Sequence, residues 1–132
     1  MITLSPEHAT LRAAAALAAT LALLNSGATG AQVYIYGNTR PANGAAAGAD
    51  SLVIFVLARP AGVIADGVLT LAPANDALIL LTGVATWSRI IVGGATALDC
   101  DVSDPAGTAM IRLATTQLYA GGSVRMTAGV LG

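Results

Sequence analysis

The first apolar run of the chain has the spacing of an α-helix. Ser5-Pro6-Glu7 is a typical helix start, with an N-cap serine, a proline at the first helical position and an acid in the first turn. Asn25-Ser26-Gly27 supplies the stop. We therefore predict one helix over residues 5–25. Between these signals alanines fill most positions, and leucines recur at roughly helical intervals: Leu11, Leu17, Leu21 and Leu24.

The predicted helix has no polar face, and such a helix is usually buried or lies between proteins. We expect it to dock against a neighbour or against the rest of the chain, with Leu17, Leu21 and Leu24 as candidate interface residues. A secretory signal peptide would have a similar apolar part, but Glu7 and His8 stand where a signal peptide carries basic residues. The run is also shorter than the about 20 apolar residues of a membrane span, so we expect no membrane partner.

After Gly30 the pattern changes to short β-branched and aromatic runs separated by Gly, Pro, Asn and Asp, which predicts strands. The stretch 77–92 is too long for one strand, and we expect Gly83 to divide it. The continuous apolar run 51–58 is typical of a strand buried on both faces. The predicted strands are Gln32–Tyr36, Ser51–Ala58, Val68–Leu71, Thr86–Val92, Ala97–Val102, Met110–Ala114 and Val124–Val130.

Turn signals separate these strands. Gly93-Gly94 predicts a two-residue hairpin, and Pro60-Ala61-Gly62 is expected to end the second strand. Further turns are predicted at 73–76, 104–107 and 119–122. A long Ala/Gly-rich loop, residues 39–50, is a candidate contact element, since a flexible loop of small residues can order on a partner.

Seven or eight short strands with frequent turns favour a mainly β fold over a parallel α/β sheet. We predict a jelly-roll-like antiparallel β-sandwich over residues 31–132 with one N-terminal α-helix. The 132 residues contain no repeat, linker or charge run that would mark a second domain, so we treat 1–132 as a single domain.

The composition indicates how much of the surface is expected to contact other proteins. The chain is 55% hydrophobic and only 10% charged, against about 25% charged residues in ordinary domains. Part of this apolar surface is therefore expected at an interface, and we predict a homo-oligomer. Lysine is absent, which suits contact surfaces but also fits the codon bias of a GC-rich genome. A net charge near −1 argues against a nucleic-acid partner.

Residues that carry chemistry are scarce. His8 is the only histidine, and Cys100 lies between two aspartates, where a buried structural thiol is favoured over a reactive one. Asp99 and Asp101 would share one strand face, where two carboxylates could meet a calcium ion, although a solvent-facing edge or loop explains them equally well. The glycines form no phosphate-binding loop. We predict no enzyme activity, no catalytic residue, no metal and no cofactor.

The aromatic residues leave two interpretations open. Trp87 and Arg89 alternate on one strand, either as an exposed cation–π hot spot for a protein partner or as a core tryptophan beside an arginine. Tyr34 and Tyr36 share a face and would serve as a sugar-stacking platform or, more often, as core or interface residues. All four are candidate interface residues.

Three pieces of the chain carry a family resemblance: residues 33–37 with Arg40-Pro41-Ala42-Asn43, residues 83–90, and residues 120–127. In their order and spacing they resemble small virion structural proteins of tailed bacteriophages, a match that covers most of the chain from Gln32 onward. The resemblance implies a jelly-roll-like sandwich that decorates or cements the capsid shell, and it implies no catalytic residue. The run 51–58 departs from it by being more continuously apolar.

The leading hypothesis is therefore a capsid decoration or cement protein on the capsid surface of a virion. Its expected partners are the major capsid protein and copies of itself. A tail, neck or fibre-associated virion protein shares the same compositional arguments. From another class, a carbohydrate-binding module would use Tyr34, Tyr36 and Trp87 as stacking rings, although aromatic residues make up only 4% of the chain.

Overall fold

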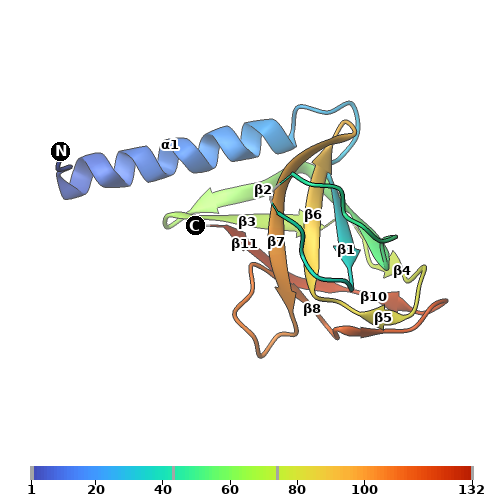
Figure 1. The fold of residues 1–132 in the computed structure, drawn as a ribbon. Helices are drawn as coiled ribbons and strands as arrows, with labels where there is room; N and C mark the ends of the chain where they lie inside the picture. The colour runs from blue at the N-terminus through green and yellow to red at the C-terminus, as the bar shows by residue number, and fades with distance from the viewer. Residues whose placement is uncertain (1, 43, 74, 132) are drawn as a thin grey trace.

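The computed structural model describes residues 2–42, 44–73 and 75–131. They form a β-barrel with one helix, α1 (Pro6–Leu24), which extends from one side of it (Figure 1). The strands are β1 (Gln32–Tyr36), β2 (Val53–Ala65), β3 (Val68–Pro73), β4 (Ala77–Leu78), β5 (Gly83–Val84), β6 (Trp87–Val92), β7 (Ala95–Ser103), β8 (Ile111–Leu113), β9 (Gln117–Leu118), β10 (Ser123–Val124) and β11 (Met126–Leu131).

The main sheet closes on itself in the order β1-β2-β3-β11-β8-β7-β6. The mainly β character with an N-terminal helix agrees with the prediction, but the jelly-roll-like antiparallel sandwich is wrong. Strand β1 pairs with β2 on one side and with β6 on the other, so the seven strands form one closed barrel rather than two packed sheets. The β7–β8 pair is moreover parallel. Alternating side chains define the two faces of a strand, but they do not specify its neighbours.

The barrel interior is filled by side chains that alternate along the strands, as expected for a small barrel. Strand β2 shows this alternation, because Phe55 is fully buried whereas Val56 is exposed. The prediction that residues 51–58 are buried on both faces is therefore wrong. The buried residues of the core include Val33, Ile35, Val53, Phe55, Leu57, Leu69, Leu71, Ile90, Val92, Ile111, Leu113 and Leu118.

Strand β2 continues through Pro60, where the sequence predicted its end. The pairing of β2 with β3 shifts register between Leu57 and Gly62, so the residues in between form a bulge. A proline is tolerated at a bulge because no ladder hydrogen bond is required of it there. The backbone N–H of Ala61 donates instead to Oδ1 of Asn25, at 2.8 Å, which ties the bulge to the end of α1.

Two tight turns shape the long hairpins. Gly93 and Gly94, both at positive φ (58° and 83°), join β6 to β7 as predicted. This is the pattern of a type I′ turn, which suits the twist of a hairpin. Asp66 and Gly67 also have positive φ (53° and 78°) and join β2 to β3.

Two short sheets lie beside the barrel, β4 with β10 and β5 with β9. They arise because the stretch 77–92 divides into three strands and because Arg125 separates β10 from β11. In Figure 1, β4, β5 and β10 lie at the lower right, away from the free end of α1.

Helix α1 begins as predicted, since the N–H of His8 donates to Oγ of the N-cap Ser5 at 3.2 Å. It ends at Leu24, with Asn25 as C-cap. Only its last two turns meet the barrel, whereas residues 6–16 are exposed along their whole length. Figure 1 shows this part of the helix projecting beyond the strands. None of the described helices combines the length and the apolar character required to cross a membrane.

Candidate protein-binding surfaces

The predicted aromatic and arginine residues gather on the outer face of three strands. The register of β1 and β6 places Tyr36 opposite Trp87 and Tyr34 opposite Arg89. The register of β6 and β7 then places Arg89 opposite Asp99. The strand pairing therefore joins all four candidates from the sequence in one cluster.

Within this cluster the rings stack on one another. Tyr36 and Trp87 have ring centroids 4.5 Å apart and planes inclined by 17°, and the guanidinium carbon of Arg89 lies 5.2 Å from the Trp87 ring centroid. Trp87 is only 1% exposed. Its Nε1–H donates to Oδ1 of Asn38 at 2.9 Å, so the polar edge of the ring is satisfied. Of the two interpretations of Trp87, the structure supports the buried one.

Arg89 and Asp99 form a buried ion pair with two-point geometry. Nε and Nη2 of Arg89 donate to Oδ1 and Oδ2 of Asp99 at 2.7 and 3.1 Å. The side chains are 7% and 2% exposed. The hydrogen bond from Arg89 holds the pKa of Asp99 below its ordinary value, and the same bond raises the pKa of Arg89. The pair is therefore fully charged at neutral pH.

The loop between β1 and β2 covers this cluster. Nη2 of Arg89 donates to the carbonyl of Ala45 at 2.7 Å, and Nδ2 of Asn38 donates to the carbonyl of Ala47 at 2.7 Å. Arg40 anchors the loop from outside, 3.0 Å from Oδ1 of Asp101. The described residues of the loop that was predicted as a contact element thus bond to their own barrel.

The seven predicted interface residues therefore differ in how far they are buried. Leu24, Tyr36, Trp87 and Arg89 are buried within the chain. Leu17 and Leu21 are partly buried against the barrel, and Tyr34 is half-buried. No residue of the seven is fully open to a partner, so the available surfaces lie elsewhere.

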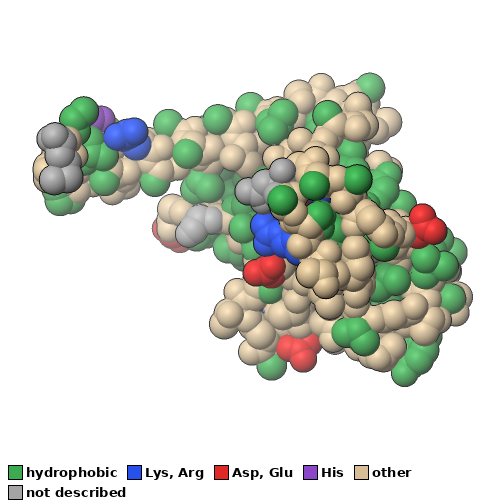
Figure 2. Space-filling model, viewed as in Figure 1, with side chains coloured by type: hydrophobic (Ala, Val, Ile, Leu, Met, Phe, Trp, Pro, Cys, Tyr) green, Lys and Arg blue, Asp and Glu red, His purple; other side chains and the backbone are tan. Residues whose placement is uncertain are grey.

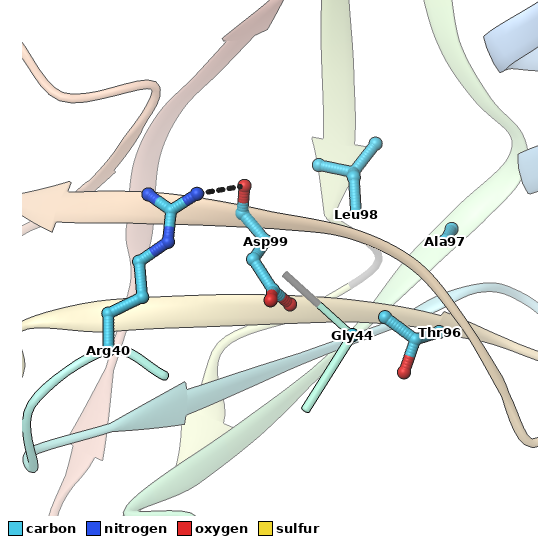
Figure 3. A pocket seen from close by; sticks show the side chains of 6 residues that line it. All are labelled: Arg40, Gly44, Thr96, Ala97, Leu98 and Asp99. Atoms are coloured by element: carbon cyan, nitrogen blue, oxygen red, sulfur yellow. Dashed lines mark hydrogen bonds between the residues drawn. The ribbon is translucent and has the colours of Figure 1, made fainter. Parts of the chain in front are cut away.

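A shallow cavity of about 480 Å³ lies between the covering loop and β7 (Figure 3). It is lined by Arg40, Gly44, Thr96, Ala97, Leu98 and Asp99. Its charged groups are occupied: the carboxylate of Asp99 is bonded to Arg89, and Nη2 of Arg40 donates to the backbone carbonyl of Asp99 at 3.3 Å. The cavity offers a ligand little free polar chemistry.

The described residues contain no group of three or more side chains that could hold a metal ion. Asp99 and Asp101 do share the outer face of β7, but each carboxylate is paired with an arginine. Both charges are therefore neutralised within the chain.

Cys100 is a buried thiol, as the sequence indicated. Burial raises its pKa to about 11, and the neighbouring Asp99 and Asp101 add smaller contributions in the same direction. Its Sγ lies 3.3 Å from Sδ of Met110 in the barrel interior. At neutral pH this thiol is protonated and unreactive.

The first open surface is an apolar cap formed by the two short sheets. Backbone N–H groups of Ile79 and Gly121 donate to the carbonyls of Gly122 and Ile79, at 2.8 and 2.9 Å, which joins the chain segments of the cap. Hydrophobic side chains are visible over the lower right of the barrel in Figure 2, where Figure 1 places these strands. The exposed apolar residues of the cap are Leu78 (61% exposed), Leu80, Leu81, Val84 and Tyr119 (65% exposed).

Sequence reasoning missed the cap, although one signal was present. The stretches 77–88 and 113–124 carry no charged residue at all. They are far apart in the sequence, and the pairing of β5 with β9 brings them together. An uncharged apolar surface on a folded protein commonly marks a contact site.

The second open surface is the projecting half of α1, in which Leu11 is 68% exposed.

Comparisons with protein-family models, curated proteins and solved structures yield no match to this chain.

Proposed function

We propose that this chain is a virion structural protein of the capsid decoration or cement type, which binds capsid subunits and copies of itself. The observation that carries the proposal is the apolar cap. Five large apolar side chains from two chain segments that contain no charged residue are held open on a closed barrel. This arrangement is suited to adhesion between proteins rather than to chemistry on a small molecule.

The energetics of the cap favour repeated weak contacts. Burying one large aliphatic side chain contributes about 1.5–3 kcal/mol, and association consumes several kcal/mol of this in lost translation and rotation. A single cap is thus a modest binder. On a shell with many identical sites, linked copies gain affinity through avidity.

The barrel gives this cap a rigid support. The arginine–aspartate pair and the stacked rings occupy the face of β1, β6 and β7, and the loop covers them. The same observation weakens the carbohydrate-binding alternative, because the rings of Tyr36 and Trp87 are buried and offer no open face to a sugar. The tail, neck or fibre location stays an alternative, and the number of copies per particle distinguishes it from the capsid surface.

The location is tested by quantitative peptide mass spectrometry on purified particles, counting this chain against the major capsid subunit. A ratio near one, or a simple fraction of it, is expected for a decoration protein. A few copies per particle would move the chain to the neck, tail or fibre. Its complete absence would overturn the virion proposal.

The contact surface is tested by adding the purified chain to particles that lack it. Leu78→Asp places a charge in the cap and is expected to weaken binding by at least about tenfold, because a buried charge without a partner is costly. Val63→Asp is the matched control, since Val63 is equally exposed but lies on β2, outside the cap. Equal binding by both variants would exclude the cap as the contact surface.

A further inference from the structure

The side of α1 that faces away from the barrel has a repeat of its own. Leu17, Leu21 and Leu24 define the barrel side of the helix. A second stripe of residues lies roughly opposite these leucines on the helix. Its members are spaced alternately three and four residues apart. This outward seam consists of His8, Leu11, Ala15, Ala18 and Ala22, all exposed.

The spacing of the outward seam is that of a coiled coil. His8, Ala15 and Ala22 occupy a positions, and Leu11 and Ala18 occupy d positions. Alanine at these positions lets two helices approach closely. A polar residue at a single a position, here His8, fixes the register of such a pair at some cost in stability.

The charges beside the seam are complementary between two copies. Glu7 precedes an a position and Arg12 follows a d position, so they are g and e residues five apart. On one helix they lie about 140° apart, and neither ion pair formed by the described residues involves them. In a parallel two-stranded coil, a g residue meets the e residue five positions later on the partner. Each Glu7 would thus face the Arg12 of the other copy.

An antiparallel pair would not use these charges. In that orientation g positions face g positions, so Glu7 would meet alanine or leucine instead of Arg12. The charge pattern therefore selects the parallel orientation.

The position of the barrel permits this pairing. The seam lies on the side of α1 away from the barrel, so the two barrels would lie on the outer sides of the helix pair. Figure 1 shows the N-terminal half of the helix free of the strands. A helical segment of this length without packing is marginal in water, and a partner helix would supply the missing contacts.

We propose that two copies of this chain pair in parallel through α1, with the outward seam as the contact and Glu7–Arg12 pairs on both sides. The proposal specifies the self-association included in the proposed function. It is tested on the purified chain alone, so that it can fail or succeed independently of particle binding.

Cysteine scanning tests the orientation. Ala15→Cys, Ala18→Cys and Ala22→Cys are each expected to form a disulfide-linked dimer under mild oxidation, because a parallel pair brings identical seam positions together. Ala13→Cys, equally exposed but on the barrel side of α1, is the matched control and is expected to stay monomeric on a denaturing gel. The native Cys100 is buried and does not interfere. Cross-linking at only one seam position would indicate an antiparallel pair and overturn the proposal.

Charge reversal tests the pairing. Glu7→Arg is expected to weaken the dimer about tenfold in sedimentation equilibrium, since it replaces two attractions by two repulsions. The double variant E7R/R12E restores opposite charges and is expected to recover the dimer. A wild-type mass of one chain, or of any number other than two, would overturn the proposal.

Discussion

Two parts of the barrel surface are rich in large hydrophobic residues, yet only one of them is open. The outer face of β1, β6 and β7 holds Tyr36 and Trp87, and the β1–β2 loop covers both. The apolar cap holds five aliphatic and aromatic residues with nothing over them. The difference lies in polar anchors: Asn38 and the Arg89–Asp99 pair bond the loop to the first surface. Tyrosine and tryptophan, which are common at protein interfaces, are thus buried on this face because the chain's own loop covers them.

The largest expected effect comes from removing the ring at the centre of the covered surface. Trp87→Ala deletes a fully buried side chain and its hydrogen bond to Asn38. We expect a loss of about 3–5 kcal/mol in the free energy of unfolding, measured by urea denaturation. Tyr119→Ala in the apolar cap is the control and should change stability by less than about 0.5 kcal/mol. Similar losses in both variants would erase the distinction between the two surfaces.

The next effect tests the ion pair under the loop. Arg89→Met keeps the apolar packing on Trp87 but leaves the Asp99 carboxylate buried without its partner, which costs about 3 kcal/mol at neutral pH. The pKa of Asp99 in the folded wild type lies below its ordinary value of 3.8. The stabilisation from the pair is therefore present above this value and is lost as the pH falls through the folded pKa.

The stability difference between wild type and R89M should accordingly shrink as the pH is lowered. It falls first as the unpaired Asp99 of R89M, whose pKa burial raises, takes up a proton, and then as the wild-type pair is lost below about pH 4. Unfolding free energies measured across this range provide the check. Arg40→Met is the matched control, because its pair with Asp101 is exposed and contributes less than about 1 kcal/mol. A difference independent of pH would show that Arg89 acts by packing alone.

The smallest effect on stability is expected in the cap. Leu78→Ser with Leu81→Ser should lower the free energy of unfolding by no more than about 1 kcal/mol, since Leu78 is 61% and Leu81 42% exposed. The same variant should remain soluble at higher concentration, because it removes exposed apolar area. A large loss of stability would mean that these leucines support the barrel, and the cap would no longer be a free surface.

Local signals in the sequence predicted most of the elements. The helix begins at Pro6 after the Ser5 cap, and Gly93-Gly94 turns the β6–β7 hairpin, because caps and turns act through hydrogen bonds and dihedral angles of a few residues. The prediction that the second strand ends at Pro60 was wrong because it depends on residues that are distant in the sequence. Strand β2 tolerates this proline because of the bulge against β3 and the hydrogen bond to Asn25.

The candidate site was less accessible to sequence reasoning. Trp87 and Arg89 were correctly placed on one strand face, but whether this face is open depends on a loop about 40 residues earlier in the chain. The apolar cap was missed because its two uncharged stretches become neighbours only through the pairing of β5 with β9. Exposure is a property of the assembled surface, and composition gives only its total amount.

By itself, the sequence determined a capped apolar helix, a series of short strands separated by turns, and a shortage of charge and of catalytic side chains. The tertiary structure decided that β1 closes the sheet between β2 and β6, which side chains the loop covers, and where apolar surface stays open. The physical reason is that periodicity records whether a residue faces the core, whereas strand partners and covering loops are selected by packing across the whole chain.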